Sequence, residues 1–257
     1  MAEADTNKPS SRALLAVEGY RVVSFDKGFL RRHAGFDSKD IRSRPFKLLR
    51  TQLTKLLAGR QASFVGITSP APAAGKSFLS LNIAASLAQL GDRPVYLVDL
   101  DLRRASMAEQ LELTVEKGVD AFLRGEVQSL QEIALRLDDL PLVLVPTNQV
   151  TSGSEEYVSG PAFARLIELL RAKSQNAVVL FDLPPVFASD DAMICIEALD
   201  GYIMVVDSGS TTRRQLQEAI EMLQPSPMLG SVLNRYKGGL LDSYGYYSHT
   251  YDRYYGG

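Results

Sequence analysis

The sequence contains a single cysteine, two histidines and no tryptophan among its 257 residues. One cysteine excludes an intramolecular disulfide, and Cys195 lies in an apolar run that predicts a buried core residue in a reducing compartment. The two histidines are His33 and His249. Two histidines and one cysteine give no support to a histidine-based catalytic triad or a zinc site, so the chemistry must rest on other residue types.

Long apolar runs are also missing. No stretch approaches the ~18 apolar residues of a membrane-spanning helix. The polar start MAEADTNKPSSR lacks the apolar segment of a signal peptide. We therefore expect a cytoplasmic protein whose membrane association, where it occurs, comes through a partner.

Charge is unevenly distributed along the chain, although the net charge is only −2. Residues 1–60 contain 13 Lys and Arg against 6 Asp and Glu, whereas the remainder contains 15 against 24. A basic front and an acidic body indicate a contact within an assembly as readily as a nucleic-acid or membrane partner. The basic segment carries no nucleic-acid-binding motif, so we expect no nucleic-acid partner.

Apolar runs alternate with helical patterns through most of the chain. The predicted strands are Phe64–Thr68, Val95–Asp99, Leu142–Val145, Ala177–Asp182, Tyr202–Val206 and Gly230–Leu233. The predicted helices are Pro45–Gly59, Lys76–Leu90, Gly118–Arg124, Pro161–Lys173, Asp190–Leu199 and Thr212–Leu223, with a loop at Thr147–Gly160. Continuous apolar strands with helices between them are typical of a mostly parallel sheet covered on both faces. We therefore predict a doubly wound α/β fold with ligands at the carboxyl ends of the strands.

The segment Phe64–Arg104 contains the pattern around which the chain is organised. A strand leads into a loop that ends in Gly75-Lys76-Ser77, and a helix follows. In a P-loop the backbone N–H groups and the lysine face the phosphates, and the serine hydroxyl holds Mg²⁺. The pattern G-x-x-x-x-G-K-[ST] has Pro70 where its first glycine is expected. The residues expected to contact the nucleotide are Ala73, Ala74, Gly75, Lys76, Ser77 and Phe78.

Three acidic residues lie at the ends of predicted strands: Asp99, Asp101 and Asp182. In a doubly wound sheet these ends converge on the mouth of the P-loop. Mg²⁺ prefers hard oxygen ligands and keeps several waters, so one or two carboxylates with Ser77 and the phosphates suit it. Together with Gly75-Lys76-Ser77, they predict the binding of a nucleotide with Mg²⁺.

Three motifs and the end of the chain resemble one known family. The motifs are the Gly75-Lys76-Ser77 loop, LVDLDLRR (Leu97–Arg104) and VVLFDLPP (Val178–Pro185), and the C-terminus is rich in tyrosine. They resemble the bacterial tyrosine kinases, the cytoplasmic autokinases of capsule and exopolysaccharide assembly. That family is a branch of the deviant P-loop ATPases, which also contains partition and site-selection ATPases. The similarity extends from about Pro45 to the C-terminus.

The resemblance implies a role for each site residue. Lys76 would bind the phosphates, and Ser77, Asp101 and Asp182 would hold Mg²⁺. Asp99 would be the catalytic base, because a free tyrosine has a pKa of about 10 and its hydroxyl needs a proton acceptor at neutral pH. Arg103 would reach a phosphate and Asn234 would contact adenine.

The tail supplies the phosphate acceptors that the resemblance implies. Six tyrosines fall in the last 14 residues: Tyr244, Tyr246, Tyr247, Tyr251, Tyr254 and Tyr255. In the family, the tail of one subunit enters the active site of its neighbour in a ring, which is associated with a helix motif E-x-x-R-x-x-R. The corresponding positions here are Arg44, Lys47 and Arg50, with arginine in place of the glutamate. We expect a homo-oligomer built through these residues.

The implied organisation has three parts and several partners. We predict a partly disordered N-terminal segment at 1–37, a P-loop kinase domain at 38–237 and a flexible tyrosine-rich tail at 238–257. The resemblance implies a separate membrane polysaccharide co-polymerase, which recruits the kinase to the inner face of the membrane, and a tyrosine phosphatase as a further partner.

Two alternatives stay open. The first is a partition-type ATPase switch, although that branch has a lysine at the start of its P-loop where this chain has Ala71. The second is a catalytically inactive scaffold of the export machinery, which the unusual loop residues Pro70, Ala73 and Ala74 would favour. Phosphotyrosine formation separates the kinase from both, and ATP turnover separates the switch from the scaffold.

Overall fold

A single sheet runs through the computed structural model, which describes residues 11–25, 27–173 and 176–236. Its eight strands in this part of the chain have the order β1-β4-β5-β3-β6-β2-β7-β8. They are β1 (Arg21–Val23), β2 (Phe64–Thr68), β3 (Val95–Asp99), β4 (Leu135–Leu137), β5 (Leu142–Val145), β6 (Val178–Asp182), β7 (Gly201–Asp207) and β8 (Met228–Asn234). Neighbouring strands are parallel except for β4 and β5, which are antiparallel. The predicted mostly parallel α/β sheet is thus confirmed.

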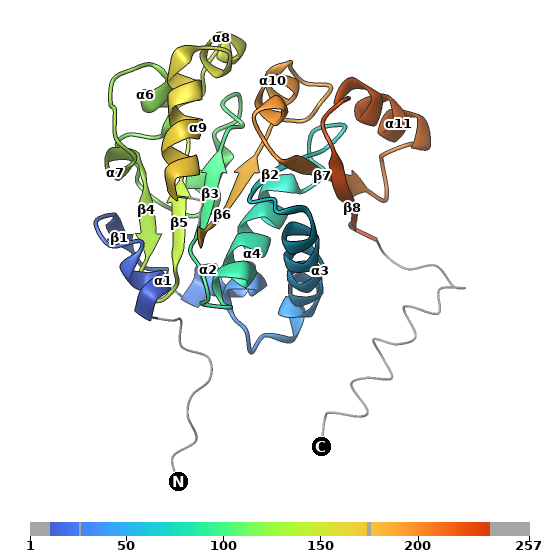
Figure 1. Cartoon of the computed structure of the whole chain (residues 1–257). Helices are drawn as coiled ribbons and strands as arrows, with labels where there is room; N and C mark the ends of the chain where they lie inside the picture. Colours follow the sequence, from blue (N-terminus) through green and yellow to red (C-terminus); the bar gives the residue numbers. More distant parts are fainter. Residues whose placement is uncertain (1–10, 26, 174–175, 237–257) are drawn as a thin grey trace, which may run out of the picture.

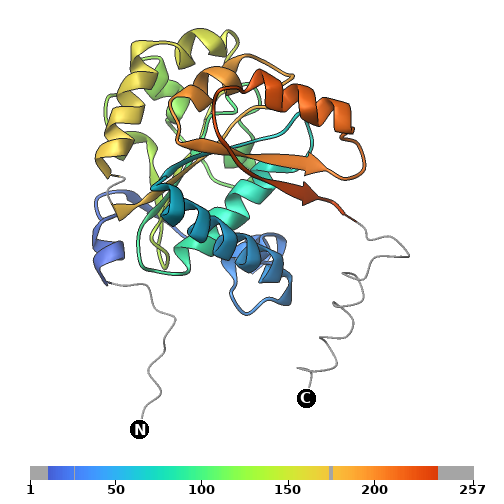
Figure 2. The ribbon, with the colours of Figure 1, turned by 45° about the vertical axis from the view of Figure 1, so that its right-hand side comes forward.

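Helices cover both faces of this sheet (Figure 1). The longer ones are α3 (Arg44–Arg60), α4 (Lys76–Ala88), α9 (Pro161–Lys173), α10 (Asp191–Glu197) and α11 (Arg213–Met222). The shorter ones are α1 (Ser11–Leu15), α2 (Lys27–Arg32), η1 (Ala34–Phe36), η2 (Ile41–Ser43), α5 (Ser106–Gln110), α6 (Val119–Leu123), α7 (Leu130–Ile133) and α8 (Ser154–Val158). Helices α3 and α4 lie side by side on one face, as both views show (Figure 1, Figure 2).

Two apolar clusters, one on each face, form the core. Successive strand residues contribute to opposite clusters: Phe64 and Tyr96 to the cluster under α9, α10 and α11, Val65 and Leu97 to the cluster under α3 and α4. This alternation follows from the period of two along a strand. Because both faces are buried, every residue of β2, β3 and β6 is apolar or small until the strands reach the site. Cys195 is buried in the first cluster, as predicted.

The N-terminal segment is integrated into this architecture. Strand β1 pairs with β4 in parallel, and the ring of Tyr20 meets that of Tyr96 edge to face at 6.2 Å. Phe29 and Phe36 are buried in the cluster under α3 and α4. The division of the chain at residue 37 stays a prediction, but the segment before it adds a strand and core residues to the same sheet.

The helices and strands that were predicted from the sequence differ from the observed ones mainly where the observed element is short. Strands β2, β3 and β5 and helix α9 have the predicted bounds, and the other long elements differ by one to three residues at an end. The sequence pattern did not predict β1, β4, α5, α7 and the N-terminal helices. It was wrong to interpret Thr147–Gly160 as loop throughout, because Ser154–Val158 forms α8. Helices of five residues span little more than one turn, so their sequences carry no full apolar period. Within the described residues, no helix has the length and apolar character needed to cross a membrane.

Candidate active site

The loop between β2 and α4 is held against the chain that follows β6. The Thr68 hydroxyl donates to the Pro184 carbonyl at 2.7 Å, and the Val186 amide donates to the Ser69 carbonyl at 2.8 Å. The Ser69 hydroxyl closes the first turn of the loop by donating to the Ala71 carbonyl at 2.8 Å. The loop then delivers the chain to α4, whose N-terminus presents free backbone N–H groups and the positive end of the helix dipole.

Two residues in left-handed backbone conformations shape this loop. Gly75, the residue before α4, has φ +86°, and Ala73 has φ +63°. A Cβ on Gly75 would lie 2.3 Å from Nδ2 of Asn234. That same nitrogen donates to the Ala74 carbonyl at 2.8 Å. Asn234, for which we predicted an adenine contact, is thus engaged with the loop backbone, and Gly75 leaves the room for its amide.

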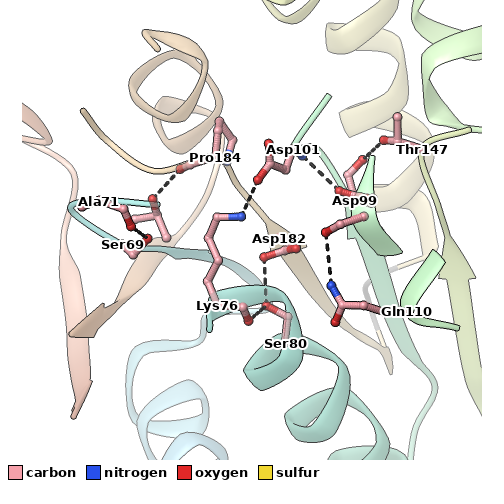
Figure 3. Close-up of polar contacts among 12 residues, drawn as sticks. Ser69, Ala71, Lys76, Ser80, Asp99, Asp101, Gln110, Thr147, Asp182 and Pro184 are labelled. Atoms are coloured by element: carbon pink, nitrogen blue, oxygen red, sulfur yellow. Dashed lines mark hydrogen bonds and ion pairs between the residues drawn. The ribbon is translucent and has the colours of Figure 1, made fainter. Parts of the chain in front are cut away.

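The three predicted carboxylates lie together at the carboxyl edge of the sheet (Figure 3). Strands β3 and β6 are neighbours and place Asp99 directly opposite Asp182. Asp101 lies two residues past β3, where its backbone N–H donates to Oδ1 of Asp99 at 3.1 Å. All three residues are at most 3% exposed. Lys76, on the first turn of α4, extends toward them, and its ammonium pairs with Oδ2 of Asp101.

Burial and mutual repulsion dominate the electrostatics of this cluster. Burial, followed by the charges of Asp182 and Asp101, raises the pKa of Asp99 well above its ordinary value. Burial also raises the pKa of Asp182, against the opposing effects of Lys76 and of hydrogen bonds from Ser77 and Ser80. Burial alone would lower the pKa of Lys76, but the attraction of Asp182, Asp101 and Asp99 raises it overall. The lysine is therefore charged and neutralises part of the acidic cluster.

The residues predicted to hold Mg²⁺ offer hard oxygen donors close to one another. The Ser77 hydroxyl hydrogen-bonds to Asp182, and the Ser80 hydroxyl lies 3.2 Å from Oδ1 of the same carboxylate. Oδ2 of Asp99 is buried and has no hydrogen-bond partner. No group of three or more His, Cys, Asp or Glu side chains within residues 11–236 that the structure describes is arranged to hold a metal ion by itself. This donor set fits an ion that takes few protein ligands and completes its shell with water and phosphate, as Mg²⁺ does.

A cavity of about 300 Å³ opens over this cluster. Its wall includes Lys76, Ser77 and Phe78 of α4, and Asp101 lies at its base. The predicted loop residues Ala73 and Gly75 also line it, while Ala74 is buried and accepts the hydrogen bond from Asn234. The cavity thus joins the residues of the first two sequence motifs, with Pro185 from the third.

Three arginines line the cavity, and two of them have acidic partners. Arg103 donates to Glu155 at 2.8 Å and to the Ser154 hydroxyl at 3.1 Å, and it lies 3.7 Å from Asp191. These contacts direct its guanidinium to α8 and α10. Arg235 pairs with Asp207 at 3.0 Å. The phosphate contact predicted for Arg103 would require it to leave or share these partners.

Several residues that line the cavity were not predicted from the sequence. Arg104, Ser106 and Gln110 come from the segment just after LVDLDLRR, and Arg235 follows Asn234. The Gln110 side chain donates to the Ser106 hydroxyl at 3.1 Å. Proximity to a recognised motif is the one signal that could have found these residues, because none of them has a distinctive spacing.

The predicted oligomer residues lie on and around the first turns of α3. Arg44 is exposed. The Lys47 ammonium donates to the Ser38 carbonyl at 2.5 Å, and the Arg50 guanidinium donates to the Ser86 carbonyl near the end of α4 at 2.9 Å. Two of the three therefore make contacts within the chain. The predicted phosphoacceptor tyrosines, 244 to 255, lie outside the described residues.

Sequence comparison finds similar curated proteins, although no protein-family model matches the chain. Tyrosine-protein kinase YwqD of Bacillus subtilis is 30% identical over 217 residues, which cover 82% of this chain and 88% of that protein. Succinoglycan biosynthesis transport protein ExoP of Rhizobium meliloti is 28% identical over 82% of this chain. The chain spans only 28% of the length of ExoP.

Solved structures share the fold. The kinase domain of Escherichia coli tyrosine kinase ETK matches with a TM-score of 0.73 at 21% identity, over 88% of this chain and 92% of that one. The VpsO kinase domain matches with a TM-score of 0.68 at 29% identity, over 77% and 97%. Cobyrinic acid a,c-diamide synthase of Mycobacterium smegmatis, with a bound ATP analogue and magnesium, matches with a TM-score of 0.58 at 20% identity, over 74% and 82%.

Proposed function

The chain belongs to the bacterial tyrosine kinase family, and we propose that it transfers the γ-phosphoryl group of ATP to tyrosines of its own C-terminal tail. The observation that carries this proposal is the position of Lys76, which lines one cavity with Asp101 and is attracted by the buried carboxylates of Asp182, Asp101 and Asp99. The binding of an ATP analogue and magnesium by a protein of the same fold supports the choice of nucleotide.

Lys76 binds the phosphates of ATP in this proposal. Lys76 is the first residue of α4. The backbone N–H groups at a helix N-terminus are a general site for phosphate, and they lie in the same turn. Ser77, Asp101 and Asp182 hold Mg²⁺, which supplies positive charge to the transferring phosphoryl group. The pairing of Lys76 with Asp101 means that phosphate and carboxylate compete for the same ammonium.

Asp99 accepts the proton of the incoming tyrosine. As the phenolic oxygen attacks the γ-phosphorus, the bond from that phosphorus to the bridging oxygen of ADP breaks, and the phenolic proton passes to the carboxylate. The free, buried Oδ2 of Asp99 is a suitable acceptor because no other group occupies it. Burial and the neighbouring carboxylates raise the pKa of Asp99, which favours the uptake of a proton by this carboxylate.

The acceptors we propose are Tyr244, Tyr246, Tyr247, Tyr251, Tyr254 and Tyr255 of a neighbouring subunit. Such transfer in trans needs a homo-oligomer, with Arg44, Lys47 and Arg50 near its interface. ExoP, which this chain resembles, is a succinoglycan biosynthesis transport protein. By analogy, the phosphoryl transfer serves polysaccharide biosynthesis and export. A membrane co-polymerase, as partner, then recruits the kinase to the inner face of the membrane, and a tyrosine phosphatase resets the tail.

The test is the intact mass of the purified protein after incubation with Mg²⁺ and ATP. The proposal predicts mass increments of one or more phosphates, which map to tail tyrosines and disappear in Lys76→Met. Protein that gains no phosphate but turns ATP over would instead be a partition-type switch. Protein that gains no phosphate and turns over no ATP would be an inactive scaffold.

A further inference from the structure

The segment before α3 contacts the helix that begins at the P-loop. Residues of α2 and η1 pack against the outer face of α4: the Gly35 backbone N–H donates to Oδ1 of Asn82 at 2.7 Å, and Nε2 of Gln89 donates to the Gly35 carbonyl at 3.1 Å. The approach is close, since a Cβ on Gly35 would lie 2.4 Å from the Asn82 carbonyl oxygen. This segment therefore sits in one defined position along α4.

His33 is buried within this contact and touches two walls of the cavity. Its ring stacks on Phe29 with centroids 4.4 Å apart and lies 5.5 Å from the ring of Phe78. The imidazole also hydrogen-bonds to the backbone of Gln110, the last residue of α5. Phe78 and Gln110 both line the cavity, from α4 and α5 respectively. His33 thus bridges the P-loop helix and the segment that follows the Asp99–Asp101 motif.

The hydrogen bonds around Asn82 determine which protonation state of the His33 imidazole is compatible with its surroundings. Because Oδ1 of Asn82 accepts from Gly35, its amide nitrogen must donate, and it does so to the Phe78 carbonyl at 2.8 Å. The same nitrogen lies 3.5 Å from Nδ1 of His33, which must then accept. The ring proton is then left on Nε2, which can donate it in the hydrogen bond between the imidazole and the Gln110 backbone. A second proton on Nδ1 would point at the Asn82 donor, so only the neutral imidazole satisfies this network.

We propose that His33, in its neutral form, is a positioning residue for the nucleotide, which it serves by holding Phe78 and Gln110 at their places in the cavity wall. This inference rests on the proposed function for the identity of the ligand, ATP. Phe78 directly follows the metal-binding candidate Ser77, so a shift of the first turn of α4 would move the groups that face the phosphates. His33 itself contributes no atom to the reaction.

The surroundings of His33 oppose its protonation. Burial and the charge of Arg32 lower its pKa, and the Gln110 backbone and Glu112 act in the other direction. Arg32 and Glu112 also pair with each other, which ties α2 to the chain just after α5. Since the pKa is lowered in the folded protein, His33 is neutral there at and above its ordinary pKa of about 6.5, and the neutral form is lost only as the pH falls through the lowered pKa.

The experiment compares three variants of the full chain. His33→Leu keeps an apolar side chain but removes both hydrogen bonds, and His33→Gln retains a donor and an acceptor. Phe25→Leu is the matched control, because Phe25 packs on Phe29 and Phe36 of the same segment. The Kd of Mg²⁺-ATP is measured by calorimetry at pH 5 and pH 8, together with KM and kcat for tail phosphorylation at pH 8.

We expect His33→Leu to raise Kd and KM for ATP about tenfold at pH 8, which corresponds to about 1.4 kcal/mol, with kcat within about twofold. His33→Gln restores most of the affinity, and Phe25→Leu leaves it unchanged. The wild-type Kd rises as the pH falls from 8 to 5, through the lowered pKa of His33, and this rise disappears in His33→Gln. An unchanged Kd in His33→Leu, or equal losses in His33→Leu and Phe25→Leu, would overturn the proposal.

Two features keep the test decisive. If His33→Leu does not fold, the pH dependence of ATP binding by the wild type and by His33→Gln still decides the outcome. Because calorimetry measures binding without turnover, a protein that binds ATP but phosphorylates nothing would overturn the proposed kinase function and leave the positioning role of His33 testable.

Discussion

The ammonium of Lys76 and the carboxylate of Asp101 form a buried ion pair between the first turn of α4 and the segment after β3 (Figure 3). Both side chains are less than one-tenth exposed. Asp182 and Asp99 also attract the same ammonium. Lys76 therefore balances three buried carboxylates at once, so its removal and the removal of one carboxylate have unequal consequences.

The first prediction concerns the unequal losses of stability on removing Lys76 and on removing one carboxylate. Lys76→Met leaves the three carboxylates without a counter-charge and should lower the free energy of unfolding by roughly 3 kcal/mol, the scale for breaking a buried pair. Asp101→Asn should lower it by about 1 kcal/mol, because Lys76 keeps its attraction to Asp182 and Asp99. Urea denaturation without nucleotide measures both. Equal losses would contradict the shared role of the lysine.

The second prediction concerns the backbone of the loop. Gly75→Ala introduces a Cβ at φ +86°, 2.3 Å from Nδ2 of Asn234. A left-handed non-glycine residue costs roughly 1–2 kcal/mol, and here the contact adds to it. Ala73→Gly removes the same kind of strain at φ +63°, offset by about 0.5–1 kcal/mol of unfolded-state entropy.

Gly75→Ala should therefore weaken both stability and ATP affinity, and Ala73→Gly should be neutral or slightly stabilising. The two variants are matched, since they exchange the same two residue types two positions apart. Thermal denaturation and calorimetry with Mg²⁺-ATP measure the outcomes. A loss of ATP affinity in Ala73→Gly equal to that in Gly75→Ala would show that the loop depends on composition and not on these conformations.

The third prediction concerns Arg103, whose guanidinium donates to Glu155 and Ser154. If Arg103 contacts a phosphate during the reaction, Glu155 competes for it. Glu155→Gln should then tighten ATP binding by about two- to fivefold, on the scale of an exposed ion pair. Arg103→Gln should weaken it. Unchanged affinity in both variants would limit Arg103 to holding the segment after β3 against α8 and α10.

The sequence predicted the long elements and the main cluster of the site for physical reasons. Strands β2, β3 and β6 are buried on both faces, so their continuous apolar runs mark them, and the acidic residues that end β3 and β6 mark the edge where these strands meet. The fold class and the family were therefore recognised correctly. The placement of Asp99 opposite Asp182 agrees with the expectation that both strand ends converge.

The contacts around His33 could not be predicted in the same way. They join residues 47 to 77 positions apart, through backbone groups and a side-chain amide, none of which leaves a periodic pattern. Asn234 shows the same limit, because its amide reaches Ala74 from 160 residues away. Strand β1 has three residues, which are too few to distinguish a strand from a loop.

The most direct test of the central claim, transfer between subunits to the tail, mixes two proteins that each lack one part of the reaction. One is Lys76→Met with its tail intact, and the other has Phe at all six tail tyrosines but an unaltered active site. After incubation with Mg²⁺ and ATP, intact-mass analysis reads each protein separately. The account predicts phosphate on the tail of the Lys76→Met protein in the mixture and none when it is incubated alone. An unmodified Lys76→Met protein in the mixture, while wild-type protein phosphorylates itself, would contradict it.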